Sequence, residues 1–256
     1  MLSHPGHVRA INEDAVACLV PKDIERDSKW EVLALVADGM GGHAAGEVAS
    51  GIAAETVLRL CRELEGSPPE ILNACLVAAN ATILERSRVD PACSGMGTTC
   101  TVLAMHEGRA FLAHIGDSRA YLLRNGELRQ ISEDDSLVAE MVRKGRLSEQ
   151  EARRHAERHV ILRALGSEEN PKLTIWQHGL PVCAGDAFVL CSDGLTNLVD
   201  DAAIAAIVAR LAPRDACNSL CEAALAAGGT DNISVGVFKV VADRLASSDS
   251  ESGANE

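Results

Sequence analysis

Two patterns of hydrophobic positions alternate along the 256-residue chain. The first consists of short apolar runs bounded by glycine or charged residues, which predict β-strands. Such runs lie at residues 15–20, 32–37, 98–104, 109–115, 118–124, 127–130, 172–179, 187–191 and 233–241. Asn125-Gly126 separates two of these runs and favours a type I′ hairpin turn, so antiparallel pairing is expected there.

The second pattern repeats apolar residues every three or four positions, which is typical of helices that face a core. It predicts helices at residues 45–64, 70–86, 201–211 and 213–226, and Ser67-Pro68-Pro69 is expected to end the first and start the second. Strands and helices occur in separate groups. This grouping predicts an α+β fold in which antiparallel sheets pack together and helices lie outside them.

Two segments depart from both patterns. Residues 132–171 are charged and helical in pattern, with few apolar anchors, and we expect a partly exposed, mobile excursion from the core. Residues 247–256 are rich in Ser, Asp and Glu, so a disordered acidic tail is predicted after a single domain at residues 1–246. A charged linker is expected around residues 22–29.

Composition narrows the possible partners. Hydrophobic residues make up 47% of the chain and aromatic residues 2%, so a sizeable core must be built from aliphatic side chains. The formal net charge of −13 argues against nucleic acid and anionic membranes as partners, because their phosphates would be repelled.

Cysteine usage and the N-terminus point to a cellular compartment. The nine cysteines are scattered, lack paired C-x-x-C spacing and mostly lie in apolar runs, as buried free thiols of a reducing compartment do. The first residues are too polar for a signal peptide, and no run approaches the roughly 18 apolar residues of a membrane span. A cytoplasmic location without membrane association is therefore expected.

Acidic residues recur where an apolar strand meets a glycine. The four places are Asp38-Gly39, Gly116-Asp117, Asp193-Gly194 and Gly229-Thr230-Asp231. A carboxylate beside the core is costly unless its charge is neutralised, and oxygen ligands without a His or Cys cluster favour a hard cation such as Mg²⁺ or Mn²⁺. Ordinary turn or helix-capping aspartates are the alternative interpretation.

The order of six motifs resembles the protein phosphatase 2C family of metal-dependent serine/threonine phosphatases, especially its compact bacterial members. The motifs are Arg9-x-x-Asn12-Glu13-Asp14, Asp38-Gly39-Met40-Gly41-Gly42, Gly97-Thr98-Thr99, Gly116-Asp117-Ser118-Arg119-Ala120-Tyr121, Ser192-Asp193-Gly194-Leu195 and Gly229-Thr230-Asp231-Asn232. The resemblance covers the chain from about Gly6 to Val241. It implies a four-layer α-β-β-α sandwich, with helices on both outer faces and a flap insertion at about residues 136–170.

The resemblance also implies a site that holds two Mn²⁺ or Mg²⁺ ions and possibly a third. Asp38 would be catalytic as the carboxylate that bridges two ions, and Arg9 would be catalytic as the residue that binds the substrate phosphate. The other implied metal ligands are Asp193 and Asp231 for one ion, Glu13 and the Gly39 carbonyl for another, and Asp117 with Asp193 for the third. Asp14 would not contact an ion directly but would hold a metal-bound water, and Asn232 would also lie just outside the direct ligands.

The implied reaction is direct attack on phosphorus by a metal-activated water, without a phosphoenzyme. Two positions depart from the family pattern. Met40 stands where many eukaryotic relatives carry a histidine that protonates the leaving group, so no general acid is assigned. Asp135 stands where relatives often carry the histidine of an Asp-His-Ser motif. His43 is a candidate catalytic residue or simply a solvated histidine of a glycine-rich turn.

Phosphoserine and phosphothreonine proteins are the implied substrates, and a bacterial Ser/Thr kinase is the implied opposing enzyme of a monomeric phosphatase. In the flap, Arg153, His155, Arg158 and His159 could contact substrate or only cover a solvated helix face. Two other functions stay open. A catalytically silent scaffold would be expected to lose metal carboxylates that this chain keeps, and a phosphatase of a small phosphorylated metabolite would keep them.

Overall fold

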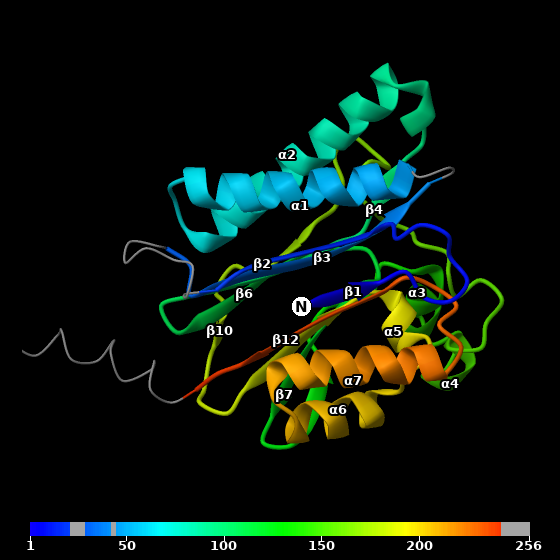
Figure 1. Cartoon of the computed structure of the whole chain (residues 1–256). Coiled ribbons are helices and arrows are strands. Elements are labelled where there is room, and N and C mark those ends of the chain that lie inside the picture. The colour runs from blue at the N-terminus through cyan, green and yellow to red at the C-terminus, as the bar shows by residue number, and fades with distance from the viewer. Residues whose placement is uncertain (21–28, 42–44, 242–256) are drawn as a thin grey trace, which may run out of the picture.

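Two antiparallel sheets lie face to face at the centre of the structure, and helices cover both outer faces (Figure 1). The computed structural model describes residues 1–20, 29–41 and 45–241. The predicted acidic tail, most of the predicted linker and His43 lie outside the described residues. The expected α+β sandwich with four layers is confirmed.

The first sheet has seven strands and lies under helices α1 and α2. Its main order is β10-β6-β5-β3-β2, with β4 paired to β3 and β9 paired to β6. The strands are β2 (Asp14–Leu19), β3 (Val32–Met40), β4 (Gly97–Thr98), β5 (Cys100–His106), β6 (Arg109–Ile115), β9 (Thr174–Ile175) and β10 (Leu180–Pro181).

The second sheet has five strands in the order β1-β12-β11-β7-β8 and lies against helices α6 and α7. Its strands are β1 (Leu2–His4), β7 (Arg119–Arg124), β8 (Glu127–Gln130), β11 (Ala187–Cys191) and β12 (Ile233–Lys239). Asn125 and Gly126 join β7 to β8 with φ angles of 53° and 82°. Both angles are positive, as the predicted type I′ turn requires.

The long helices begin and end close to their predicted bounds. They are α1 (Ala45–Glu63), α2 (Pro68–Val89), α6 (Asp201–Arg210) and α7 (Pro213–Ala226). As predicted, α2 starts at Ser67-Pro68-Pro69. The structure adds that Ser67 forms a capping box with Glu70 and that the prolines occupy the first helical turn. Shorter elements are η2 (Pro91–Cys93), α3 (Leu137–Arg143), α4 (Glu149–Ala152) and α5 (Asp193–Thr196).

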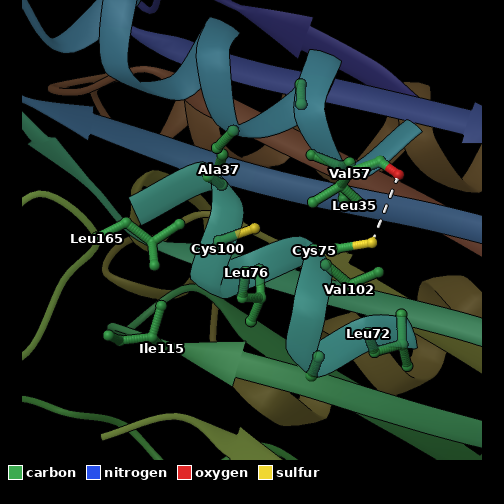
Figure 2. Close-up of a cluster of buried hydrophobic side chains, with 14 of the residues drawn as sticks. Leu35, Ala37, Val57, Leu72, Cys75, Leu76, Cys100, Val102, Ile115 and Leu165 are labelled. Carbon is green, nitrogen blue, oxygen red and sulfur yellow. Dashed lines mark hydrogen bonds between the residues drawn. The ribbon is translucent and has the colours of Figure 1, made fainter. Parts of the chain in front are cut away.

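Strand β3 shows why its sequence is a continuous apolar run. Leu33, Leu35 and Ala37 pack toward the helices, whereas Ala34 and Val36 pack between the two sheets. Because both faces of the strand are buried, no polar residue interrupts it before Asp38. Figure 2 shows the helix-facing layer, in which side chains of the sheet meet those of α1 and α2.

Several predicted boundaries were wrong. Strand β3 continues past residue 37 to Met40, because Gly39 and Met40 pair with β4. The strand predicted at residues 172–179 is only the two-residue β9, followed by β10. The helical excursion at residues 132–171 contains only the short helices α3 and α4. Strand β1 was not predicted as a separate element.

Two further expectations concern cysteines and membranes. All nine cysteines are free, and seven of them are buried, which confirms the interpretation as buried thiols. Within the part of the chain that the structure describes, no helix has both the length and the apolar character needed to cross a bilayer.

Candidate metal and phosphate site

The strand ends and loops that carry the acidic residues of the motifs lie at one end of the sandwich, on the right in Figure 1. Asp14 begins β2 and is paired with Asp38 of β3. In the other sheet, Asp193 follows β11, Asp117 precedes β7 and Asp231 precedes β12. These three positions lie at the same end of the sheet, because Cys191, the last residue of β11, is paired with residues near the starts of β7 and β12.

A hydrogen bond joins the two sheets at this end. Ser192 donates its hydroxyl to Asp14 Oδ2 at 2.8 Å, and the same hydroxyl oxygen accepts the Ser234 amide at 3.0 Å. The carboxylate contributed by β2 is therefore held directly against the segment that carries Asp193.

The backbone of Asp38 is fixed by the Thr98-Thr99 motif. The Asp38 amide donates to Thr99 Oγ1 at 2.9 Å, and its carbonyl accepts the Thr99 amide at 2.9 Å and the Thr98 hydroxyl at 3.0 Å. Burial raises the pKa of the Asp38 carboxyl well above its usual range, and the charges of Asp14, Asp193, Asp117 and Asp231 raise it further. These five carboxylates therefore share one electrostatic neighbourhood.

Two carboxylate oxygens of this neighbourhood, Asp14 Oδ1 and Asp117 Oδ1, are buried and accept no hydrogen bond from the described residues. Burial, and secondarily neighbouring carboxylates, raises the pKa of Asp14 to about 7 and that of Asp117 to about 8. A buried carboxylate oxygen without a donor is unfavourable, and a divalent cation is the partner that oxygen ligands of this kind suit. The donor set therefore fits Mn²⁺ or Mg²⁺.

The carboxylates do not form a closed coordination shell. Among residues 1–20, 29–41 and 45–241, no three His, Cys, Asp or Glu side chains already converge at metal-ligating positions. Several of their oxygens are instead hydrogen-bonded to the protein. Asp193 Oδ2 accepts the Asn197 amide group at 2.9 Å, and Asp231 Oδ1 accepts the Asn232 backbone amide at 2.9 Å. Binding of ions would require these side chains to adjust.

Glycines allow the close approach of the elements that carry the site. A Cβ at Gly39 would lie 2.1 Å from the Gly46 carbonyl oxygen, and one at Gly46 would lie 2.5 Å from Glu13 Oε1. The first turn of α1 thus packs directly on β3, with the Glu13 carboxylate beside it. A Cβ at Gly194 would lie 2.0 Å from the Asn232 carbonyl oxygen, so the start of α5 touches the segment that carries Asp231.

Asn232 ties the loop between β1 and β2 to the end of the sandwich. Its Oδ1 accepts the Glu13 amide at 2.8 Å, and its Nδ2 donates to the carbonyl oxygens of Pro5 and Ile11 at 3.0 Å each. The loop that contains Arg9 and Glu13 is therefore fixed at three points by one buried side chain.

Arg9 lies on the solvent-exposed side of Asp231. Its guanidinium is half exposed and donates from Nη2 to Asp231 Oδ2 at 2.8 Å. The structure therefore brings together Arg9, Glu13, Asp14, Asp38, Asp117, Asp193, Asp231 and Asn232 at one end of the fold. Gly46 was not among the candidate residues named from the sequence, although it lies only four positions after the Asp38-Gly39-Met40-Gly41-Gly42 motif.

A cleft of about 540 Å³ opens beside the acidic cluster. Asp117 and Asp193 are among its lining residues, together with residues of the flap helices α3 and α4 and of the segment between α5 and α6. Arg153 and Arg158 of the flap line it, and His159 Nδ1 lies 3.9 Å from Asp193 Oδ2. The other metal-site candidates are not among its lining residues, so the cleft extends away from the cluster.

A four-layer sandwich with a cluster of carboxylates at one end is the arrangement expected of a metal-dependent phosphatase. The protein phosphatase 2C family model matches residues 6–227. The chain belongs to the protein phosphatase 2C family.

Relatives in this family include curated proteins and a solved structure. The chain is 42% identical over 245 residues to the serine/threonine protein phosphatase PstP of Mycobacterium tuberculosis, covering 93% of this chain but only 44% of that protein. It is 35% identical over 236 residues to the serine/threonine phosphatase stp of Listeria innocua, covering 90% of each. A crystal structure of the PstP catalytic domain in complex with two manganese ions matches with a TM-score of 0.79 and 40% identity, covering 94% of this chain and 96% of that chain.

Proposed function

We propose that this protein is a metal-dependent serine/threonine phosphoprotein phosphatase. The observation that carries the proposal is the cluster of carboxylates around Asp38, in which Asp14 and Asp117 each keep a buried oxygen without a hydrogen-bond donor. The relatives named as serine/threonine phosphatases support the same activity.

The proposed cofactor is a pair of Mn²⁺ or Mg²⁺ ions, possibly with a third. Asp38 would bridge the pair, with Asp193 and Asp231 on one ion and Glu13 and the Gly39 carbonyl on the other. Asp117 and Asp193 would hold the third. When bound, the ions supply a water activated for attack on phosphorus.

Arg9 is proposed to bind the substrate phosphate. A guanidinium can donate two parallel hydrogen bonds to phosphate oxygens, and the half-exposed position of Arg9 beside Asp231 suits that role. Its present partner, Asp231, would then be occupied by metal. Asn232 and Asp14 would keep the loop and the sheets in place behind the ligands. Met40 offers no proton to the leaving group, so this role is assigned to no side chain.

The proposed substrates are proteins phosphorylated on serine or threonine, and a bacterial Ser/Thr kinase is the proposed opposing enzyme. The cleft beside Asp117 and Asp193 would hold the part of the substrate next to the phosphorylated residue, with Arg153 and Arg158 in its wall. A monomeric state and a cytoplasmic location are further parts of the proposal.

The test is hydrolysis of p-nitrophenyl phosphate and of a phosphothreonine peptide with and without added Mn²⁺. Activity should depend on the metal, disappear with a chelator and disappear in Asp38→Asn and Asp193→Asn. Asp215→Asn is the control, because Asp215 is an exposed carboxylate on α7.

Other outcomes would contradict the proposal. A folded protein that binds Mn²⁺ weakly and hydrolyses neither substrate would be a silent scaffold. Faster hydrolysis of a small phosphorylated metabolite than of any phosphoprotein, measured on a substrate panel, would replace the proposed substrate class.

A further inference from the structure

Asp135 is a buried carboxylate at the base of the flap, and it is not among the proposed metal ligands. Its exposed fraction is 1%. One carboxylate oxygen, Oδ2, accepts the Gly116 amide at 3.1 Å, and the other, Oδ1, pairs with Nη2 of Arg163. Arg163 belongs to the last segment of the flap, through which the chain returns to the core. This segment contains Leu162, Arg163 and Leu165 and is called the returning limb. Asp135 thus joins this limb to the loop between β6 and β7.

The backbone of Asp135 makes the same connection. Its amide donates to the Gly116 carbonyl at 2.7 Å, and its carbonyl accepts the Leu162 amide at 2.7 Å. Four contacts therefore converge on Asp135, two with Gly116 and two with the returning limb. A residue held in this way can transmit the position of one segment to the other.

The loop on the far side of this connection carries a proposed metal ligand. Gly116 directly precedes Asp117, whose Oδ1 is buried without a hydrogen-bond donor. The loop has little freedom, because Gly116 adopts a φ of +106° and a Cβ there would lie 2.5 Å from the Thr99 side chain. The next residue, Ser118, is hydrogen-bonded through its hydroxyl to Thr99 at 2.8 Å.

Arg163 is the ion-pair partner of the buried Asp135 carboxylate. A buried carboxylate without a counter-ion is strongly unfavourable, so loss of the guanidinium would be expected to shift Asp135 and the Gly116 amide that it accepts. The flap would not be released by this change. Leu165, farther along the returning limb, keeps two backbone hydrogen bonds to Thr98 at 2.9 and 3.0 Å.

We infer that Asp135 and Arg163 are positioning residues that hold the Gly116–Asp117 loop, and through it the Asp117 carboxylate, in the place required for metal binding. The inference rests on the proposed function, because it takes Asp117 as a metal ligand. It links the base of the flap to the acidic cluster by a specific pair of side chains. Replacement of a residue that orients a metal ligand without contacting the metal commonly changes metal affinity by about 10–100-fold.

The test compares Arg163→Gln with a matched control, Arg124→Gln. Arg124 also pairs with a carboxylate that is 1% exposed, Asp186, at 2.6 Å. The arginine side chains are similarly exposed, 26% for Arg163 and 32% for Arg124. The Arg124 pair holds the end of β7 to the loop before β11, and neither of its residues lines the cleft.

Mn²⁺ binding is measured by calorimetry, and melting temperature and phosphatase activity are recorded on the same samples. The weakest Mn²⁺ site should lose about tenfold in affinity in Arg163→Gln and in Asp135→Asn, but not in Arg124→Gln. All three variants should melt at lower temperature. Arg163→Lys, which keeps the charge, should recover part of the affinity.

A double variant separates positioning from general destabilisation. In an Asp117→Asn background, adding Arg163→Gln should not weaken Mn²⁺ binding further, because the ligand that it positions is already gone. If the wild-type protein binds Mn²⁺ and Arg163→Gln binds it as the Arg124→Gln control does, the inference is wrong and the proposed function stands. If the wild-type protein binds no Mn²⁺, the proposed function itself fails.

Discussion

Arg9 donates a hydrogen bond from Nη2 to Asp231 Oδ2 at 2.8 Å, joining residues 222 positions apart in the chain. The contact places the proposed phosphate-binding side chain on a proposed metal ligand. A metal ion on Asp231 would neutralise that carboxylate and leave the guanidinium available for phosphate. The protein would therefore bind the metal ion before the substrate phosphate.

Replacement of Arg9 tests its role as the phosphate ligand. Arg9→Ala should lower kcat/KM by about 10–100-fold, since a hydrogen bond to a charged group contributes about 1.5–3 kcal/mol. Arg9→Lys should recover only part of the loss, because an ammonium group cannot form the paired contacts of a guanidinium. Steady-state kinetics measure both. Full activity of the lysine variant would exclude paired hydrogen bonds from Arg9.

Asp38→Asn should have opposite effects on activity and on the stability of metal-free protein. Activity should be lost. Because burial, and then the neighbouring carboxylates, raise the pKa of Asp38, removal of its charge should raise the melting temperature of chelator-treated protein at pH 8. Calorimetric melting with Asp215→Asn as the control measures the change. A lower melting temperature for Asp38→Asn would contradict the proposed repulsion between the Asp38 carboxylate and its neighbouring carboxylates.

The metal-free protein should lose stability as the pH rises from 6 to 8. Asp14 and Asp117 have folded-state pKa values of about 7 and about 8, well above the value of about 3.9 for an unfolded Asp. The folded state therefore binds more protons than the unfolded state in this range, and the free energy of unfolding falls with pH by about 2 kcal/mol per unit.

Denaturant unfolding at several pH values, with a chelator present, measures this slope. Asp117→Asn should reduce the fall between pH 7 and 8, and saturating Mn²⁺ should abolish it, since metal binding displaces the protons. A free energy of unfolding that rises from pH 6 to 8 without metal would contradict the raised pKa values.

Gly194→Ala tests the contact between α5 and the segment that carries Asp231. The new methyl group would lie 2.0 Å from the Asn232 carbonyl oxygen, so the two segments must separate. We expect a loss of about 3 kcal/mol in the free energy of unfolding and weaker Mn²⁺ binding. Gly51→Ala is the control, because a Cβ there meets no atom within 4 Å and a helix gains about 0.5–1 kcal/mol from this change. Equal stability of the two variants would show that the close contact is not important.

The long helices and most of the long strands were predictable because their sequences carry a local signal. Helix α7 begins and ends at the predicted residues, since Pro213 starts it and its apolar residues recur at helical spacing. The end of β3 was not predictable in the same way. Gly39 and Met40 are strand residues only because they pair with β4, which is nearly 60 positions away in the sequence.

The candidate site was predictable as a set of residue types but not as a set of contacts. Aspartates beside glycines at strand ends indicate a cation site, and the order of the motifs supplies the roles. The Arg9–Asp231 pair joins two loops whose distance depends on the whole fold. Asp135 was noticed only as a departure from the family pattern, and its pairing with Arg163 is evident only from the returning limb of the flap.

The most direct measurement is a crystal structure of the protein grown with Mn²⁺, with anomalous scattering recorded to locate the metal. The account predicts two manganese peaks joined by the Asp38 carboxylate, one near Asp193 and Asp231 and the other near Glu13 and the Gly39 carbonyl. Arg9 should no longer be paired with Asp231. A well-diffracting crystal without manganese at Asp38 would contradict the central claim that this cluster is a metal centre.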